Sequence, residues 1–403
     1  MLLHKSTPRE DYISALEGIG MYYHTTPSAS GPVPYWTEDH FYEISPSEVE
    51  AIEVATETLH QQCVQTVRAV IDAGPEYLRN YELPPTAHKA IELSFNNDPT
   101  LCGRFDFAFD SQNIKLLEYN ADTPTGILEA SIAQWDWLEA VYPQYDQFNS
   151  LHERLVKRIG ELASKLNLQT FHVSAVANGD KVEEEWSTAE YIKECAQLAG
   201  LQTFEVELAD VMYDTQSRRF FDPEGNTISA LYKLYPWENM MYEPFFEVIR
   251  TQATSISFFE PPWKAIISNK AFLVDLYKTF PDSPYVLPAS FNPADLPQAS
   301  SWVSKPLWGR EGDGVSVRTP LAIFDNPQGA TGSGPKVYQE YVKLPDLGYG
   351  NVVLGSWVVG QSSAGVCFRE SDSLVTDYYA RCAPHLINAP APTEDLRQLW
   401  LTE

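Results

Sequence analysis

Arg104-Phe105-Asp106-Phe107-Ala108-Phe109 places a phenylalanine at every second position of a short stretch. Strict alternation is typical of a β-strand with one buried face, so the phenylalanines are expected to enter the core, with Arg104 and Asp106 on the opposite face. A polar turn at 110–113 leads into a second expected strand at 114–120. The two strands together predict a β-hairpin.

The register of this hairpin decides what its polar face can do. If Asp106 pairs with Glu118, then Arg104 pairs with Asn120, and the four polar side chains gather on one face. Two carboxylates and an amide oxygen suit Mg²⁺, which fills its remaining positions with water and nucleotide phosphate. The pattern fits equally well an Arg–carboxylate pair on a solvent-exposed sheet face, so both interpretations stay open at this point.

The hairpin is part of a longer motif. The second strand runs into Leu117-Glu118-Tyr119-Asn120-Ala121-Asp122-Thr123-Pro124-Thr125. With the alternating strand, this stretch resembles the RFD and EYNAD segments of the glutathionylspermidine synthetase family. The likeness continues in order along nearly the whole chain. Further stretches that carry it are Lys233-Leu234-Tyr235-Pro236-Trp237-Glu238, Pro262-Trp263-Lys264, Ser268-Asn269-Lys270-Ala271, Lys305-Pro306 and Cys367-Phe368-Arg369.

The resemblance implies a fold and two cofactors. The fold class is α/β (α+β), an ATP-grasp fold with a pre-ATP-grasp-like substrate domain and interleaved lobes. The cofactors are ATP and Mg²⁺. Residues 1–165 are expected to form an N-terminal helical region with the magnesium-binding hairpin. Residues 166–260 are expected to form a substrate-side α/β domain, and residues 261–403 the nucleotide-binding lobes.

The resemblance also implies roles for individual residues. Arg104 is the catalytic cation that stabilises the reacting phosphoryl group. The expected magnesium ligands are Asp106, Glu118 and Asn120. The residues expected to bind ATP are Lys270, Lys305, Gly309, Gly312, Gly314, Gln339, Glu340, Tyr341 and Val342. Those expected to bind substrate are Thr123, Thr125, Glu184, Glu185 and Arg369.

Local chemistry bears on several of these residues. Ser268 is expected to cap a helix that begins at Asn269, which leaves Lys270 in the first turn, where the helix dipole disfavours a cation and a bound anion would compensate it. The run Gly309-Arg310-Glu311-Gly312-Asp313-Gly314 could close over a triphosphate with its backbone N–H groups. A simple hairpin turn has the same composition.

An ordinary structural role also fits the acidic pair. Glu184 and Glu185 stand near the start of an expected helix, where acidic residues are favoured whatever the function. Their assignment to substrate therefore depends on the resemblance.

The remaining chain alternates helices and strands. The clearest helix spans 45–71, with a capping box between Ser45 and Glu48 and a stop at Gly74-Pro75. Other helices are expected after Thr125 and at 149–166, 183–199 and 268–280. Strands are expected at 170–177, 203–208, from 228, and at 304–306, 337–342 and 352–359, with a polar loop at 326–335.

The composition limits the possible partners. The 403 residues include 55 acidic and 28 basic side chains, a formal charge of -27. This charge argues against nucleic-acid binding and favours a cationic substrate or a metal. The five cysteines form no CxxC pair. The sequence has no apolar leader and no run of about 20 apolar residues, so the cytoplasm is the expected compartment and no membrane contact is expected.

The resemblance implies an ATP-dependent carboxylate–amine ligase of the ADP-forming kind, acting through an acyl phosphate on small molecules. Glutathione or a related peptide would supply the acid, and a polyamine the amine. Pro124 and Gly126 interrupt the small polar run after EYNAD, so a different peptide or amine stays open. A nucleotide-binding protein without ligase activity is a further alternative.

An amidase is not expected. The chain begins directly in the synthetase region, whereas the bifunctional members of the family carry an additional amidase domain with a catalytic cysteine. Cys382 and His385 are close in sequence, but this spacing on an irregular stretch does not indicate a catalytic pair.

Overall fold

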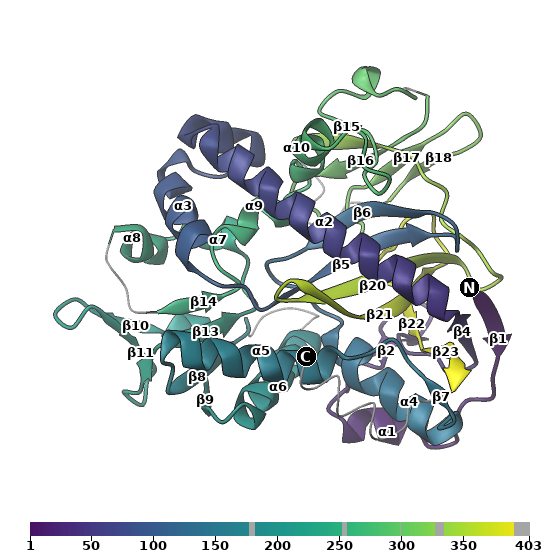
Figure 1. Ribbon diagram of the computed structural model, residues 1–403, viewed down its shortest axis with the longest axis horizontal. Coiled ribbons are helices and arrows are strands. Elements are labelled where there is room, and N and C mark those ends of the chain that lie inside the picture. Colours follow the sequence, from purple (N-terminus) through teal and green to yellow (C-terminus); the bar gives the residue numbers. More distant parts are fainter. Residues whose placement is uncertain (177–181, 252–255, 299, 327–333, 391–403) are drawn as a thin grey trace.

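The computed structural model describes residues 1–176, 182–251, 256–298, 300–326 and 334–390. Helices and sheets are mixed along these ranges (Figure 1), which confirms the expected α/β fold class. The polar loop predicted at 326–335 lies almost entirely outside them. No helix within these ranges is long and apolar enough to cross a membrane.

The predicted hairpin lies in a five-stranded sheet assembled from two distant parts of the chain. In spatial order its strands are β22 (Arg381–Ala383), β21 (Ser362–Ser371), β20 (Asn351–Val359), β5 (Cys102–Phe109) and β6 (Ile114–Asn120). The central pair, β5 and β20, is antiparallel, with Phe107 opposite Leu354. The blue hairpin and the yellow-green strands lie side by side in Figure 1. The lobes are therefore interleaved, as expected.

The long helix α2 (Pro46–Asp72) packs against this sheet and confirms the predicted helix and its start. The Ser45 hydroxyl accepts the backbone N–H of Glu48, and the Glu48 carboxylate accepts the backbone N–H of Ser45. This capping box satisfies two donors that a helix start leaves unpaired.

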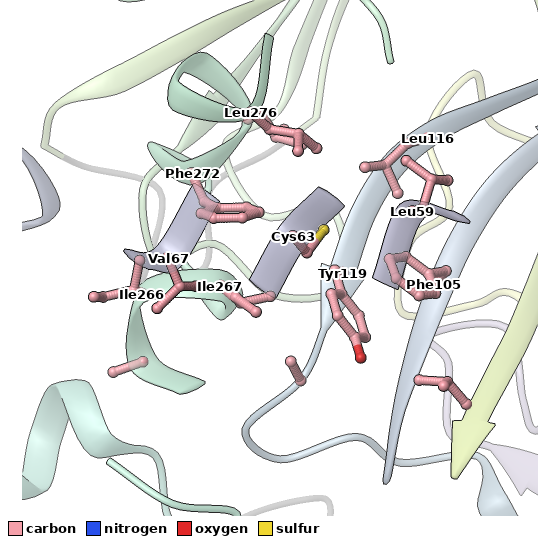
Figure 2. Packing of buried hydrophobic residues seen from close by; sticks show 14 of the residues in the cluster. Leu59, Cys63, Val67, Phe105, Leu116, Tyr119, Ile266, Ile267, Phe272 and Leu276 are labelled. Atoms are coloured by element: carbon pink, nitrogen blue, oxygen red, sulfur yellow. The ribbon is translucent and has the colours of Figure 1, made fainter. Parts of the chain in front are cut away.

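The apolar stripe of α2 joins the hairpin to the following helices. Figure 2 shows Leu59, Cys63 and Val67 of α2 between the hairpin and the helices α9 (Lys264–Ser268) and α10 (Phe272–Thr279). All three side chains are fully buried. Burial of an aliphatic side chain of this size stabilises a fold by roughly 1.5–3 kcal/mol. The core therefore holds the hairpin in a fixed position.

The two faces of β5 differ as the alternation predicts. Its phenylalanines lie in the core, whereas Arg104 and Asp106 line a cavity. Gly355 of β20 makes room for the arginine, because a Cβ there would lie 3.1 Å from Cδ of Arg104 and 3.0 Å from Sγ of Cys367. The polar face thus depends on a glycine in the neighbouring strand.

A four-stranded parallel sheet forms an α/β unit with two helices. Its order is β14 (Ser257–Phe259), β13 (Ala230–Lys233), β8 (Thr170–Ser174) and β9 (Gln202–Glu205). The helices α5 (Leu151–Leu166) and α6 (Val182–Leu198) pack together beside it. The predicted strand–helix–strand order is confirmed. The second strand ends at Glu205, however, because the chain enters a short 3₁₀ turn at Leu208.

A further antiparallel sheet is formed entirely within the last third of the chain. Its order is β15 (Ala289–Ser290), β19 (Lys336–Glu340), β16 (Trp302–Pro306), β17 (Ser316–Arg318) and β18 (Ile323–Asp325). The strands expected near 304–306, 337–342 and 352–359 are thereby confirmed, the last as β20 of the central sheet. The N- and C-terminal parts share another sheet, ordered β1 (Leu2–Lys5), β4 (His40–Ile44), β23 (His385–Pro390) and β7 (Tyr145–Asp146).

The smaller elements complete the described chain. The helices are α1 (Tyr12–Gly18), α3 (His88–Asn97), α4 (Gln134–Val141), α7 (Trp237–Met240) and α8 (Pro244–Thr251). The remaining strands are β2 (Thr25–Thr26), β3 (Val33–Pro34), β10 (Met212–Asp214), β11 (Arg219–Phe221) and β12 (Thr227–Ile228). α4 continues a π-helical turn, Glu129–Ala133, and confirms the helix expected after Thr125.

The helix expected at 268–280 is wrong as a continuous element. Asn269 has extended backbone angles (φ -78°, ψ 136°) and separates α9 from α10. Ser268 therefore ends a helix and does not cap one. Its hydroxyl accepts the N–H groups of Ala121 and Asp122, at 3.2 and 2.8 Å. Lys270 lies in the turn between the helices, so the predicted conflict with a helix dipole does not arise.

Candidate active site

Two adjoining cavities meet at Asp106, Glu118 and Lys270, which line both. The larger, with a volume of about 330 Å³, is called the polar cavity here. Its lining includes Tyr35, Arg104, Asn120, Thr123, Thr125, Glu184, Glu185, Glu238, Arg310, Cys367 and Arg369. The smaller, about 110 Å³, is called the apolar cavity. Its lining includes Val303, Lys305, Val315, Val317, Gln339, Glu340, Tyr341, Val342, Leu344 and Val353.

The hairpin has the register in which the four polar side chains gather on one face. Asp106 lies opposite Glu118, and Arg104 lies opposite Asn120, with an irregularity after Asp106 that shifts Phe107 to Leu116. All four polar side chains line the polar cavity. The register therefore assembles the proposed magnesium ligands and the arginine at one place.

Arg104 is held by two partners. Its Nε and Nη2 donate to the two oxygens of Asp106, at 2.8 and 3.3 Å, and its Nη1 donates to the carbonyl of Thr125. Arg104 is 6% exposed and Asp106 5% exposed. The Arg–carboxylate pair expected as the alternative is thus present, but it lines a cavity instead of an open sheet face. Burial opposes the charge of Arg104, yet Asp106 raises its pKa above the ordinary value.

Two lysines lie close to the carboxylate of Glu118. Lys270 Nζ is 3.3 Å from Glu118 Oε2, and Lys305 Nζ donates to the Leu117 carbonyl and to Gln339 Oε1, at 2.7 and 2.8 Å. Burial opposes ionisation of Glu118, but the lysine charges lower its pKa to about 2. Burial lowers the pKa of Lys305 to about 8. The carboxylate is therefore ionised at neutral pH, and Lys305 titrates close to it.

Asn120 lies beside the two other predicted metal ligands, Asp106 and Glu118. Its Nδ2 lies 3.3 Å from Asp106 Oδ2 and 3.2 Å from Glu118 Oε1. Turning the amide over would replace this nitrogen with the amide oxygen, and three oxygen donors would then face one point. Such donors suit Mg²⁺. The described ranges hold no group of three or more His, Cys, Asp or Glu side chains able to bind a metal, so a metal here would also need nucleotide oxygens or water.

The apolar cavity collects most of the predicted nucleotide residues. Val317 and Val353 are buried in its wall, and Gln339 is 2% exposed. The Gln339 amide is occupied, since it accepts from Lys305 and donates to the Leu116 carbonyl at 2.9 Å. It therefore positions the lysine. Apolar walls beside a charged end suit a ligand with a flat ring and phosphates.

The glycine run lies between the cavities. Gly309 and Gly312 line both, whereas Gly314 accepts a hydrogen bond from Lys336 and is absent from the described linings. Gly312 has φ 72°, and a Cβ there would lie 2.7 Å from Cγ1 of Val375 and 2.8 Å from the carbonyl oxygen of Thr376. Only glycine fits this close approach.

Sequence reasoning missed how the segment 233–238 holds the site. Lys233 is fully buried, and its Nζ lies 2.8 Å from Oδ1 of Asp122, the residue that follows Asn120-Ala121. The other oxygen of Asp122 accepts the backbone N–H of Trp237 at 2.8 Å. Glu238 pairs with Arg310 of the glycine run. In the sequence, residues 233–238 stand out only by their resemblance to the family. Ion pairs between residues far apart in the chain leave no local sequence pattern.

Cys382 and His385 do not form a catalytic pair. Both ring nitrogens of His385 are engaged elsewhere, Nδ1 with Gln134 Oε1 at 2.8 Å and Nε2 with the backbone N–H of Phe148 at 3.2 Å. Burial lowers the pKa of His385 to about 3 and raises that of Cys382. His385 is therefore not available as a base for the Cys382 thiol.

The fold and the paired cavities define an ATP-grasp protein. A glutathione synthetase-like effector from Globodera pallida shares this fold, with a TM-score of 0.57 and 9% identity over 95% of this chain and 98% of that one. The sequence places the chain more closely. It belongs to the glutathionylspermidine synthase preATP-grasp family, whose sequence model matches residues 3–388.

Three relatives illustrate the family. A putative acid–amine ligase of Haemophilus influenzae is 36% identical over 94% of this chain and 97% of its own length. Trypanothione synthetase of Crithidia fasciculata is 26% identical, and the match spans 55% of its length. Bifunctional glutathionylspermidine synthetase/amidase of Escherichia coli is 25% identical, and the match spans 59% of its length.

Proposed function

We propose that the protein is an ATP-dependent ligase that joins a carboxylic acid to an amine, through an acyl phosphate and with release of ADP. The family relatives named as ligases and synthetases support this class of reaction. The observation that carries the proposal is the charge of the polar cavity's lining, to which the five-stranded sheet contributes arginines and the parallel α/β unit contributes glutamates.

The five-stranded sheet supplies cations to the cavity lining. Arg104 projects from β5 and Arg369 from β21, the strands on either side of β20, and Arg369 Nη1 lies 3.8 Å from Asp106 Oδ2. Lys270 joins them at the junction with the apolar cavity. Guanidinium and ammonium groups in a site of low dielectric favour phosphate oxygens and a substrate carboxylate. We assign the nucleotide base to the apolar cavity and its terminal phosphate to the junction.

The parallel α/β unit supplies acids to the same lining. It contributes Leu234 and three glutamates, Glu184, Glu185 and Glu238. A cationic amine would be attracted to these carboxylates while its partner acid lies beside the arginines. This arrangement brings two oppositely charged reactants together in one cavity.

The proposed chemistry has two steps. A carboxylate oxygen of the acid attacks the γ-phosphorus of ATP, and ADP leaves. The amine nitrogen then attacks the acyl carbon, phosphate leaves, and the nitrogen loses a proton. Arg104 would meet charge on the transferred phosphoryl oxygens. Lys270 and Lys305 would hold the nucleotide phosphates. Mg²⁺, if held by Asp106, Glu118 and Asn120, would neutralise phosphate charge.

The remaining assignments follow from this chemistry. We assign Thr123, Thr125 and Arg369 to the acid substrate, since all three line the polar cavity beside Arg104. The proposed division of the chain is residues 1–165 for the helical region with the metal hairpin, 166–260 for the substrate side and 261–403 for the nucleotide lobes. Five buried free cysteines support a reducing compartment, and we propose the cytoplasm.

The substrates proposed first are glutathione or a related peptide and a polyamine, by analogy with the relatives' names. A different acid–amine pair is the second candidate, favoured by the match over 97% of a relative named only as an acid–amine ligase. Peptide acids and amines should be tested in pairs with MgATP, and the nucleotide product identified. ADP and phosphate are expected. AMP as the main product would contradict the mechanism, and no product with any pair would favour nucleotide binding without ligation.

A further inference from the structure

One of the acidic residues that line the polar cavity is already paired with an arginine. Arg310, from the glycine run, forms an ion pair with Glu238, and both side chains line the cavity. The two partners differ in exposure, because the Glu238 side chain is 8% exposed and the Arg310 side chain 49%. A nearly buried carboxylate is therefore matched by a cation that reaches it from the solvent side.

The backbone next to Glu238 is held by buried contacts. Glu238 follows Trp237 in α7, and the backbone N–H of Trp237 is bonded to Asp122, which is itself paired with the buried Lys233. The Trp237 indole donates to the Glu260 carbonyl at 2.9 Å. These contacts hold the start of α7 in place, so the carboxylate is presented to the cavity by a rigid support.

Arg310 is not fixed in the same way. It lies on a loop between Gly309 and Gly312, and its side chain is about half exposed. The arginine end of this pair is half exposed, so solvent screens it and ordering its long side chain costs entropy, while the buried carboxylate needs a cation but not this particular one. Another cation can therefore replace Arg310 at small cost. Burial raises the pKa of Glu238 and Arg310 opposes that rise, so a cation at this position keeps the carboxylate ionised.

We propose that Glu238 is a binding residue for the cationic end of the amine substrate, and that Arg310 occupies its place in the free enzyme. The proposal rests on the proposed ligase function and names the position of one substrate. An incoming alkylammonium group displaces the guanidinium from Glu238. The freed Arg310 remains on the loop that borders the apolar cavity, where its guanidinium can bind phosphate oxygens of the nucleotide.

The displacement gives two variants opposite effects on amine binding. Spermidine is the probe, titrated calorimetrically against the full chain without nucleotide. Glu238→Gln removes the carboxylate and is expected to weaken spermidine binding by about tenfold or more, as for loss of a charged hydrogen-bond partner. Arg310→Met removes the competitor and is expected to strengthen binding by roughly two- to fivefold, the value of a half-exposed ion pair.

Controls separate binding from folding and from total charge. Glu247→Gln on α8 removes an equal charge from an exposed Glu–Arg pair and should leave spermidine binding unchanged. Glu238→Asp keeps the charge and should restore part of the affinity. MgATP affinity of Glu238→Gln should match that of the unchanged protein, which shows that the variant is folded.

The proposal fails if Arg310→Met weakens spermidine binding, since the ion pair would then be only a structural support. It also fails if Glu238→Gln binds normally, or if neither the unchanged protein nor Arg310→Met binds spermidine or 1,4-diaminobutane at millimolar concentration. The ligase proposal is tested separately by ADP release. An amine that supports ADP release with an unchanged KM in Glu238→Gln would overturn this inference alone.

Discussion

The apolar and polar cavities are neighbours with different origins. Most residues that line the apolar cavity lie between 303 and 376, on β16, β17, β19, the start of β20 and the loops beside them, and the hairpin and Lys270 complete the lining. The polar cavity is assembled from the N-terminal segment, the hairpin, α6, α7, the turn before α10, the glycine run and β21. A general ligand such as a nucleotide can be met by local strand patterns. A particular pair of substrates requires side chains from many parts of the chain.

The largest expected effect tests whether the polar cavity depends on its buried ion pair. Asp122→Ala leaves the fully buried Lys233 without its carboxylate. Removing one partner of such a pair commonly costs about 3–5 kcal/mol of unfolding free energy. Urea denaturation measures the change, with Glu247→Gln as an exposed control. A loss of only about 1 kcal/mol, typical of an exposed pair, would show that this wall is not held by the pair.

The next effect separates chemistry from affinity. Arg104→Lys keeps a positive charge but loses the fork that grips both oxygens of Asp106. With an active substrate pair, kcat is expected to fall by ~10²–10³, as for other lost transition-state contacts. MgATP affinity, measured by calorimetry, should be largely kept. Near-normal kcat in both Arg104→Lys and Arg104→Ala would place the phosphoryl chemistry elsewhere.

The matching change in the apolar cavity should act on affinity alone. Val317 is 1% exposed and lines that cavity. Val317→Ala removes apolar surface that a nucleotide base would cover, and roughly 1 kcal/mol of binding energy corresponds to about fivefold weaker MgATP binding. kcat at saturating MgATP should not change. A fall in kcat without a change in affinity would contradict the assignment of this cavity to the base.

The smallest effect is a dependence on pH at the boundary. Burial lowers the pKa of Lys305 to about 8, so its charge is lost as the pH rises through that value. MgATP affinity should weaken by a few-fold above pH 8, and Lys305→Met should remove this dependence. Stability should change in the opposite sense. Unfolded lysine has a pKa of about 10.4, so between about pH 8 and 10.4 the unfolded chain binds more protons and stability rises with pH. Flat affinity in the unchanged protein would argue against contact between Lys305 and phosphate.

The hairpin could be predicted in detail because its information is local. Alternation around Phe105 and Phe107 fixes which face is buried, and a short turn leaves few registers. The sequence supports the pairing of Asp106 with Glu118 only as a condition, because it depends on the irregularity after Asp106, which no sequence pattern announces. The capping box of α2 is local in the same way. These elements depend on neighbours within a few residues.

The predictions from sequence are wrong or incomplete where contacts between distant residues determine the local structure. The break at Asn269 has no proline or glycine to announce it, and the Asn269 side chain instead accepts the N–H of Ala271 at 2.8 Å. The pairing of Glu238 with Arg310 joins residues far apart in the sequence. Neither residue type is unusual where it stands. Only the packing of the chain brings the Glu238 carboxylate to the lining of the polar cavity.

The pairing of β5 with β20 also bears on synthesis of the chain. Phe107 leaves the ribosome long before Leu354, its partner on the neighbouring strand. The N-terminal strand β4 is likewise synthesised long before β23, with which it pairs. Contacts of such long sequence separation slow folding, because a large loop must close before they form. The hairpin that carries Arg104 and Asp106 therefore keeps an unpaired strand edge throughout translation of the middle of the protein. During that interval the nascent chain exposes a strand edge at which edge-to-edge association is favoured.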